Sequence, residues 1–254
     1  MVTTGTDRRI LVTGASTGIG EKTVRRLAEQ GHRVVASARR KERLDALAEA
    51  YSNVEPYRLD ITSDEEVTAL VDHLKATGGL DGVVNNAGGA LGLDKVEDGD
   101  LDGWRWMYEL NVLGTLRVTQ AVLPLLRDGD GGDIVVVTST AAHEPYEGGA
   151  GYTGVKHAER MLSTTLRREI VGEPVRIIEI APGNVATEEF SLTRFSGDAE
   201  LAKKVYEGYQ PLHGEDIAEA IGWALDRPEH VNVDLMIIRP RDQAHSTKIA
   251  KKGV

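Results

Sequence analysis

The stretch RILVTGASTGIGEKTVRRLAEQG, residues 9–31, decides the fold of this chain. Its first residues, Arg9–Thr13, are mostly apolar and suit a short buried strand, whereas Ile19–Gln30 has the composition and length of a helix. Between them lies a turn with glycine at positions 14, 18 and 20, which lets the backbone bend sharply and approach a ligand closely. The start of the helix offers unpaired N–H groups and a positive dipole end. This arrangement predicts a site for the pyrophosphate of a dinucleotide; the alternative is a glycine-rich turn without a ligand.

The rest of the chain continues this alternation of short apolar runs and longer helical stretches. The apolar runs are typical of strands buried on both faces of a parallel sheet, IVVVTS at residues 134–139 most clearly. The order predicts a doubly wound α/β fold with a seven-stranded parallel sheet, in one domain over residues 1–254. The expected strands are Arg9–Thr13, Arg33–Ala38, Val54–Arg58, Gly82–Asn85, Asp133–Ser139, Val175–Ala181 and Leu235–Arg239. The expected helices are Ile19–Gln30, Lys41–Glu49, Ser63–Thr77, Gly103–Leu126, Tyr152–Val171, Ala199–Glu207 and Gly214–Leu225.

The end of the second expected strand indicates which dinucleotide binds. In an NAD site an acidic residue about 20 residues after the glycines binds the ribose hydroxyls. Here the strand is followed by Arg39 and Arg40, and no acid stands at its end. A planar guanidinium group suits a phosphate, so the two arginines predict NADP(H) with its 2′-phosphate. The alternative is that they form the solvated start of the next helix.

Composition argues against several other classes of function. The 254 residues include no cysteine, which excludes a disulfide framework, a thiolate metal site and a cysteine nucleophile. The seven histidines show no metal-ligand spacing, so we expect no metal. A formal net charge of −10 has the wrong sign for a nucleic-acid partner. No apolar run approaches the length of a membrane span and no signal peptide is evident, so we expect a cytoplasmic protein with no membrane partner.

A series of short motifs, taken in order along the chain, resembles those of the short-chain dehydrogenase/reductase family. They are TGASTGIG at residues 13–20, Leu59-Asp60, Asn85-Asn86-Ala87-Gly88, Asn111, Ser139, Tyr152 with Lys156, and Pro182-Gly183. Each motif alone is weak, but their order and intervals together are specific. The resemblance implies a three-layer Rossmann fold in a single domain, a nicotinamide cofactor and a homotetramer.

The family pattern also implies roles for individual residues. Asp60 would contact the adenine, and Pro182, Gly183, Val185 and Thr187 would hold the nicotinamide end. The expected cofactor-binding residues are Gly14, Ser16, Thr17, Gly18, Ile19, Gly20, Arg39, Arg40, Asp60, Ile61, Asn86, Ala87, Gly88, Tyr152, Lys156, Pro182, Gly183, Val185 and Thr187. The expected catalytic residues are Asn111, Ser139, Tyr152 and Lys156.

The Tyr152–Lys156 couple suits the reduction of a ketone or aldehyde, whose oxygen needs a proton and hydrogen bonds as the hydride arrives. A free tyrosine has a pKa near 10, too high for ready proton exchange at neutral pH. Lys156 lies four residues on, on the same helical face, and its ammonium should lower that pKa. Ser139, at the end of a strand, would hold the substrate oxygen, and Asn111 is expected to anchor a water that relays protons to Lys156. Taken alone, the tyrosine and lysine would be an ordinary surface pair.

The substrate is indicated by a narrower resemblance, to the branch of NADP-dependent 3-hydroxy acid (serine/allo-threonine) dehydrogenases and sulfoacetaldehyde reductases. It is carried by the segments NNAGGALG, STAAHEPYEGGAGY, TEEFSLTRFSGD and GEDIAEAIGWALDRPEHVNVDLMIIRP. It implies a small polar, anionic carbonyl/alcohol substrate. In the lid expected at about residues 188–212, Arg194 would pair with a carboxylate or sulfonate, unless it is a solvent-exposed lid residue.

One observation keeps other substrates open. Glu144, five residues after Ser139, is an expected substrate-binding residue, and an acid there would repel an anion. A neutral ketone or a cationic substrate therefore remains an alternative, and so does a β-ketoacyl thioester, although its carrier would prefer a basic pocket mouth. A non-enzymatic NADP-binding protein is a further alternative, but the four expected catalytic residues are all present.

Overall fold

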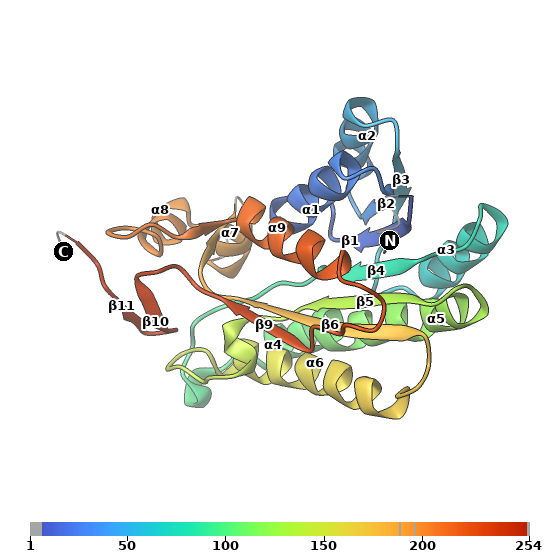
Figure 1. The fold of residues 1–254 in the computed structure, drawn as a ribbon. Coiled ribbons are helices and arrows are strands. Elements are labelled where there is room, and N and C mark those ends of the chain that lie inside the picture. Colours follow the sequence, from blue (N-terminus) through green and yellow to red (C-terminus); the bar gives the residue numbers. More distant parts are fainter. Residues whose placement is uncertain (1–6, 188, 196, 253–254) are drawn as a thin grey trace.

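The fold is built on one seven-stranded parallel sheet. The computed structural model describes residues 7–187, 189–195 and 197–252. The strand order β3-β2-β1-β4-β5-β6-β9 reverses direction between β1 and β4, which is the switch point of a doubly wound sheet. The predicted fold class is therefore confirmed (Figure 1). The sheet strands are β1 (Arg9–Thr13), β2 (Arg33–Ala38), β3 (Val54–Arg58), β4 (Gly82–Asn85), β5 (Gly132–Val137), β6 (Val175–Pro182) and β9 (Leu235–Ile238).

Helices cover both faces of the sheet, giving three layers (Figure 1). One face carries α1 (Gly18–Glu29), α2 (Lys41–Ala50) and α9 (Gly214–Leu225). The other carries α3 (Asp64–Ala76), α5 (Gly114–Asp128) and α6 (Ala150–Glu169), with α4 (Leu101–Tyr108) beside α6. None of the described helices is long and apolar enough to cross a membrane.

Alternating side chains of each strand supply the two cores. In β1, Ile10 and Val12 belong to the cluster that includes Val24 of α1, whereas Leu11 belongs to the cluster that includes Leu70 of α3. Successive residues of a strand point to opposite faces, so a continuous apolar run fills both layers. Burying each such side chain contributes roughly 1.5–3 kcal/mol to stability. Because the strands are held on both faces, their carboxyl ends give the loops that follow a fixed position.

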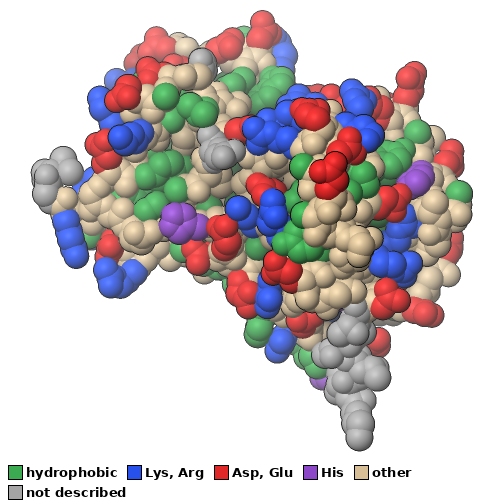
Figure 2. All heavy atoms as spheres, turned by 90° about the horizontal axis from the view of Figure 1, so that it is seen from above, with side chains coloured by type: hydrophobic (Ala, Val, Ile, Leu, Met, Phe, Trp, Pro, Cys, Tyr) green, Lys and Arg blue, Asp and Glu red, His purple; other side chains and the backbone are tan. Residues whose placement is uncertain are grey.

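The outer face of α1, α2 and α9 carries mixed charge. Figure 2 shows acidic and basic side chains interspersed over this face. Some of them tie neighbouring helices together: Arg26 of α1 lies 2.8 Å from Glu219 of α9, and Lys22 lies 3.1 Å from Glu215. Exposed pairs of this kind contribute little stability each, so the packing of α1 on α9 rests mainly on the apolar cluster beneath.

The helix predicted over Gly103–Leu126 is not regular. A π-helical turn, η2 (Glu109–Leu113), separates α4 from α5 and keeps the three segments in one continuous rod. Asn111 lies within this turn and is fully buried. Single π turns inside α-helices are often found at functional sites, and this one places a polar side chain among the cavity-forming loops.

Two further segments, the lid and the C-terminal hairpin, lie beyond the carboxyl ends of the sheet strands. The expected lid contains α7 (Phe190–Arg194) and a helix α8 (Ala199–Lys204) that is shorter than predicted. It is framed by β7 (Val185–Ala186), which pairs with β8 (Leu212–His213). The C-terminal residues form a hairpin of β10 (Gln243–His245) and β11 (Lys248–Ile249). Glu188 and Ser196 of the expected lid lie outside the described residues.

Candidate active site

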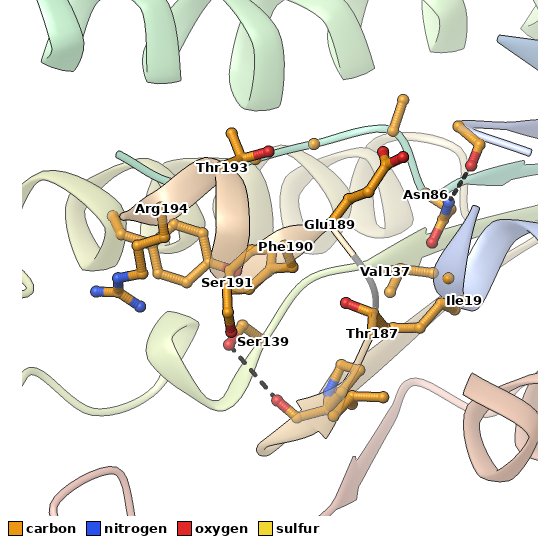
Figure 3. Close-up of a pocket in the computed structure, with 18 of the residues that line it drawn as sticks. Ile19, Asn86, Val137, Ser139, Thr187, Glu189, Phe190, Ser191, Thr193 and Arg194 are labelled. Atoms are coloured by element: carbon orange, nitrogen blue, oxygen red, sulfur yellow. Dashed lines mark hydrogen bonds between the residues drawn. The ribbon is translucent and has the colours of Figure 1, made fainter. Parts of the chain in front are cut away.

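A cavity of about 590 Å³ lies beyond the carboxyl ends of the sheet strands, where doubly wound folds bind ligands. Figure 3 shows Ile19 and Asn86 at one end of it and Arg194 at the other. The predicted site residues that line it are Gly14, Ser16, Thr17, Gly18, Ile19, Arg39, Arg40, Asp60, Ile61, Asn86, Ala87, Gly88, Ser139, Tyr152, Pro182, Gly183, Val185, Thr187 and Arg194. Gly20, Asn111, Lys156 and Glu144 lie outside this lining.

The glycine-rich turn after β1 forms a cradle that only glycine can build. Gly14 and Gly18 have φ angles of 66° and 57°, which favour glycine. A Cβ on Gly20 would lie 2.3 Å from the Gly14 carbonyl oxygen, so no side chain fits there. Asn86 donates to the Thr13 carbonyl at 2.9 Å and ties the loop after β4 to this turn. With α1 beginning at Gly18, the backbone is open to a pyrophosphate, as the sequence predicts.

The two arginines after β2 have different surroundings. Arg39 is exposed and lines the cavity. Arg40 binds both oxygens of Glu189 from the lid, with Nη2 to Oε2 at 2.8 Å, and also donates to the Ser16 hydroxyl at 2.7 Å. The hydrogen bonds from Arg40 hold the pKa of Glu189 below its ordinary value. Sequence reasoning missed Glu189, although its place beside an expected phosphate site is a signal that an acid there has a cationic partner.

Asp60 has a charge and position that suit a hydrogen-bond acceptor for the adenine end. Its Oδ1 accepts hydrogen bonds from the backbone N and the hydroxyl of Thr62, at 3.0 and 2.7 Å. Burial raises the pKa of Asp60, but these hydrogen bonds, together with the charges of Arg39 and Arg58, hold it below the ordinary value. The open cradle, the two arginines and Asp60 together fit NADP(H).

Tyr152 and Lys156 lie on α6, the tyrosine in the cavity wall and the lysine behind it. Both side chains are buried, and Lys156 Nζ lies 6.0 Å from the centre of the Tyr152 ring. Burial raises the pKa of Tyr152, and the positive charges of Lys156 and Arg194 offset only part of this. Lys156 therefore lowers the pKa of Tyr152 as predicted, but in the protein without cofactor the effect of burial is larger. The effect of the lysine was predicted from the sequence, but the larger, opposite effect of burial was not.

Ser139 follows β5, which ends at Val137 rather than at Ser139 as predicted. The reason is that Ser139 starts a short 3₁₀ turn, η3 (Thr140–Ala142), and accepts a hydrogen bond from Ala141 N at 3.1 Å. Its hydroxyl also faces the Pro182 carbonyl of β6 at 3.5 Å (Figure 3). These two contacts hold the hydroxyl in the cavity wall.

Asn111 and Lys156 both lie behind the loop that follows β4. Asn111 Nδ2 donates to the Gly89 and Met107 carbonyls at 2.9 and 2.8 Å, and its Oδ1 accepts from Gly89 N at 3.2 Å. A Cβ on Gly88 would lie 2.6 Å from Asn111 Oδ1 and 3.5 Å from Lys156 Nζ. The side chain of Asn111 thus fixes the cavity loop, and the water relay remains a prediction.

Arg194 lies over two aromatic rings at the far end of the cavity. Its guanidinium carbon is 5.5 Å from the centre of the Tyr152 ring and 5.6 Å from that of Tyr146. It donates to the Tyr146 hydroxyl at 2.7 Å and to the Gly92 carbonyl at 3.3 Å. Among the described residues, no carboxylate forms an ion pair with it. Phe190 of α7 packs edge-on against Tyr152. Sequence reasoning missed both Phe190 and Tyr146, because neither belongs to a recognisable motif.

Glu144 does not face the substrate end, which corrects the prediction for this residue. Its Oε1 accepts hydrogen bonds from Ser246 N and Oγ, both at 3.1 Å, and from Arg239 at 3.3 Å. Its Oε2 lies 3.2 Å from His245. The 3₁₀ turn after Ser139 redirects the chain, so Glu144 anchors the C-terminal hairpin instead. Within the described residues, no three His, Cys, Asp or Glu side chains gather into a group that could hold a metal ion.

A family model described as short chain dehydrogenase matches residues 8–194. The chain belongs to the short-chain dehydrogenase family. It is therefore an oxidoreductase of the type that acts on CH–OH groups.

Similar proteins place the chain on one branch of this family. An uncharacterized oxidoreductase of Mycobacterium tuberculosis is 55% identical over 255 residues, which cover 100% of both chains. An NADP-dependent 3-hydroxy acid dehydrogenase of Salmonella typhi is 40% identical over 237 residues, covering 92% of this chain and 96% of that protein. A structure of the closed form of serine dehydrogenase complexed with NADP⁺ is 36% identical, with a TM-score of 0.91, and covers 96% of this chain and 99% of that one. The predicted branch is confirmed. The predicted cofactor, NADP(H), agrees with the names of the 3-hydroxy acid dehydrogenase and of the serine dehydrogenase structure.

Proposed function

We propose that this short-chain dehydrogenase uses NADP(H) to interconvert a small, polar, anionic hydroxy compound and its aldehyde or ketone. The 3-hydroxy acids and the hydroxysulfonates are the two substrate classes that fit. The contact of Arg194 with Tyr152 carries the proposal. It sets a cation beside the phenol that would exchange a proton with the substrate oxygen.

The chain's own residues would orient the substrate and move the proton. Ser139 and Tyr152 both line the cavity, so their hydroxyls can hydrogen-bond one substrate oxygen. During reduction Tyr152 donates its proton to that oxygen, and during oxidation its phenolate takes the proton back. The bound nicotinamide supplies or accepts the hydride. Lys156, buried behind the phenol, stabilises the phenolate with its positive charge.

The anionic end of the substrate would bind Arg194. A guanidinium pairs with two oxygens of a carboxylate or sulfonate at once. The position of Glu144 removes the argument against an anion, because its carboxylate binds the C-terminal hairpin. One acid remains in the lining at this end: Glu147, which is exposed. Its presence supports the second candidate, a reductase of a neutral ketone or aldehyde.

A substrate panel tests the proposal. Purified protein with NADP⁺ is assayed against 3-hydroxypropionate, L-serine, isethionate and a neutral alcohol of similar size, and the same panel is repeated with Arg194→Met. We expect activity on at least one anion, with a KM that rises strongly in Arg194→Met, and weak activity on the neutral alcohol in both. Activity confined to the neutral alcohol would overturn the anionic class in favour of the second candidate.

We also propose that the protein assembles as a homotetramer. Exposed apolar side chains on adjoining helices support this, namely Tyr108 of α4 and Met161 of α6. Exposed apolar side chains are typical of contact surfaces where they gather into a patch. Light scattering coupled to size-exclusion chromatography gives the mass directly, and a monomer at assay concentration would contradict the proposal.

A further inference from the structure

A buried glutamate lies directly beside the catalytic lysine. Glu159 is on α6, one turn after Lys156, and its side chain is 1% exposed. Its Oε2 lies 2.6 Å from Lys156 Nζ, and its Oε1 accepts a hydrogen bond from the Thr115 hydroxyl of α5 at 3.0 Å. Lys156 also donates to the Val137 carbonyl at 3.2 Å. The catalytic lysine therefore shares its charge with a carboxylate that does not line the cavity.

The charged groups around this pair come from several elements. Lys156 and Thr115 face Glu159 from α6 and α5, and Glu159 acts on Tyr152 of α6 through its charge. Glu179 of β6 acts on both members of the pair through its charge. It is held by Thr138 at 2.7 Å and His143 at 2.9 Å, and Arg160 lies 3.7 Å away. Arg194 and Tyr146 face Tyr152 from the other side.

A buried ion pair of this kind is not explained by stability. Removing two charges from water costs several kcal/mol per ion, and apolar residues of similar volume are often as stable. Burial raises the pKa of Glu159, whereas Lys156 at 2.6 Å and the Thr115 hydroxyl lower it and favour the carboxylate. The negative charge of that carboxylate keeps Lys156 protonated and opposes ionisation of Tyr152. Glu159 therefore acts on both members of the couple in the same sense, since it disfavours loss of a proton from either.

We infer that Glu159 is a positioning residue that sets the pH at which the Tyr152–Lys156 couple releases its first proton. The inference rests on the proposed function, because the couple must exchange a proton with the substrate. Glu159 itself touches neither substrate nor cofactor. It fixes Lys156 between its carboxylate and the Val137 carbonyl and delays the ionisation of the couple to higher pH.

The direction of this effect does not depend on which group ionises. Interacting groups release protons in steps that belong to the pair. With one proton lost, the couple is either phenolate with ammonium or phenol with amine, and both states carry one positive charge fewer than before. A neighbouring carboxylate disfavours that change in either case. Removal of the carboxylate charge therefore lowers the apparent pKa of the first step, by about one unit or more for a charge within a few ångströms.

The test is the pH dependence of alcohol oxidation by the purified protein with NADP⁺. Oxidation requires the couple with one proton lost, so kcat/KM rises with pH along a limb that reports the apparent pKa. Wild type is compared with Glu159→Gln, which removes the charge at nearly constant shape. Glu169→Gln is the matched control, because Glu169 is exposed at the end of the same helix. We expect the limb of Glu159→Gln to lie about one pH unit or more lower, and that of Glu169→Gln to coincide with wild type.

A limb that stays in place in folded Glu159→Gln would overturn the inference and leave Glu159 as a neutral or purely structural group. Binding of NADPH, followed by its fluorescence, shows that the variant is folded. If Glu159→Gln does not fold, Glu159→Asp decides the matter. It keeps the charge but withdraws it by one methylene, so its limb should move the same way by less, and an unmoved limb overturns the inference. If wild type oxidises no alcohol and reduces no carbonyl of the panel, the proposed function fails and the inference fails with it. If wild type turns substrate over but the pH limb of the variant stays in place, the inference alone is overturned.

Discussion

Replacement of Arg39 by alanine should weaken NADPH binding without changing NADH binding. Within the described residues Arg39 forms no hydrogen bond or ion pair, whereas Arg40 beside it binds Glu189 and Ser16. Arg39 follows β2 at the rim of the cavity and is exposed. Its guanidinium is therefore the group that can turn to the 2′-phosphate without breaking another contact.

The magnitude follows from that position. A hydrogen bond to a charged group contributes about 1.5–3 kcal/mol. Because Arg39 is exposed and its interactions are screened by solvent, the lower end applies, about 1.5 kcal/mol or roughly a tenfold rise in Kd. NADH lacks the phosphate, so its Kd should stay the same. Higher salt should shrink the difference between wild type and variant, since screening weakens an exposed ionic contact.

The assay is a titration of each protein with NADPH and with NADH, followed by cofactor fluorescence, at low and high salt. Arg33→Ala serves as the control, because Arg33 is an exposed arginine at the other end of the same strand, paired with Asp7. Equal losses for both cofactors in Arg39→Ala would refute the reasoning, because they would show a general effect on the turn. An unchanged Kd for NADPH would refute it as well and would assign the phosphate to Arg40.

Three other changes test the rest of the site. Tyr152→Phe should abolish turnover while NADPH still binds, because only the proton donor is lost; rates near wild type would rule out the mechanism. Gly20→Ala should weaken both cofactors and lower the melting temperature, because its Cβ would lie 2.3 Å from the Gly14 carbonyl oxygen; unchanged calorimetry and binding would show that the turn can yield. Glu144→Gln should loosen the C-terminal hairpin, seen as faster hydrogen exchange at residues 243–249, while KM for an anionic substrate stays near wild type; a fall in that KM would return Glu144 to the substrate end.

Much of the cofactor end could be predicted because its signals are local. The glycines after β1 and the arginines after β2 act through backbone geometry and charge next to a strand end, and the period of the apolar residues reveals where each strand ends. Tyr152 and Lys156 are likewise local, as two residues on one helical face. Glu159 lies three residues after Lys156 on the same helical face, so the sequence spacing already allowed an ion pair between them. The pair was missed because ion pairs at this spacing usually lie on the surface of a helix.

The parts that were missed depend on contacts between distant segments. Glu144 and Ser246 are 102 residues apart, and their hydrogen bonds decide which way Glu144 points. Proximity to Ser139 along the chain was a poor guide because a 3₁₀ turn, Thr140–Ala142, lies between the two residues. The two-residue strands β7 and β8 and the short helix α7 were missed for a similar reason, since elements of that length depend on tertiary contacts rather than on a periodic pattern.

The π turn at Glu109–Leu113 has a consequence for how relatives of this chain are aligned. Such a turn is an α-helix that holds one extra residue, and each residue of a helix turns it by about 100°. Deleting a single residue here would give a smoother helix but would rotate Asn111 away from Gly89 or displace everything after it on α5. A homologue whose sequence is one residue shorter between α4 and α5 should therefore be aligned with a gap inside this turn. Whether the residue aligned with Asn111 in such a homologue still contacts the loop after β4 should then be tested by mutation.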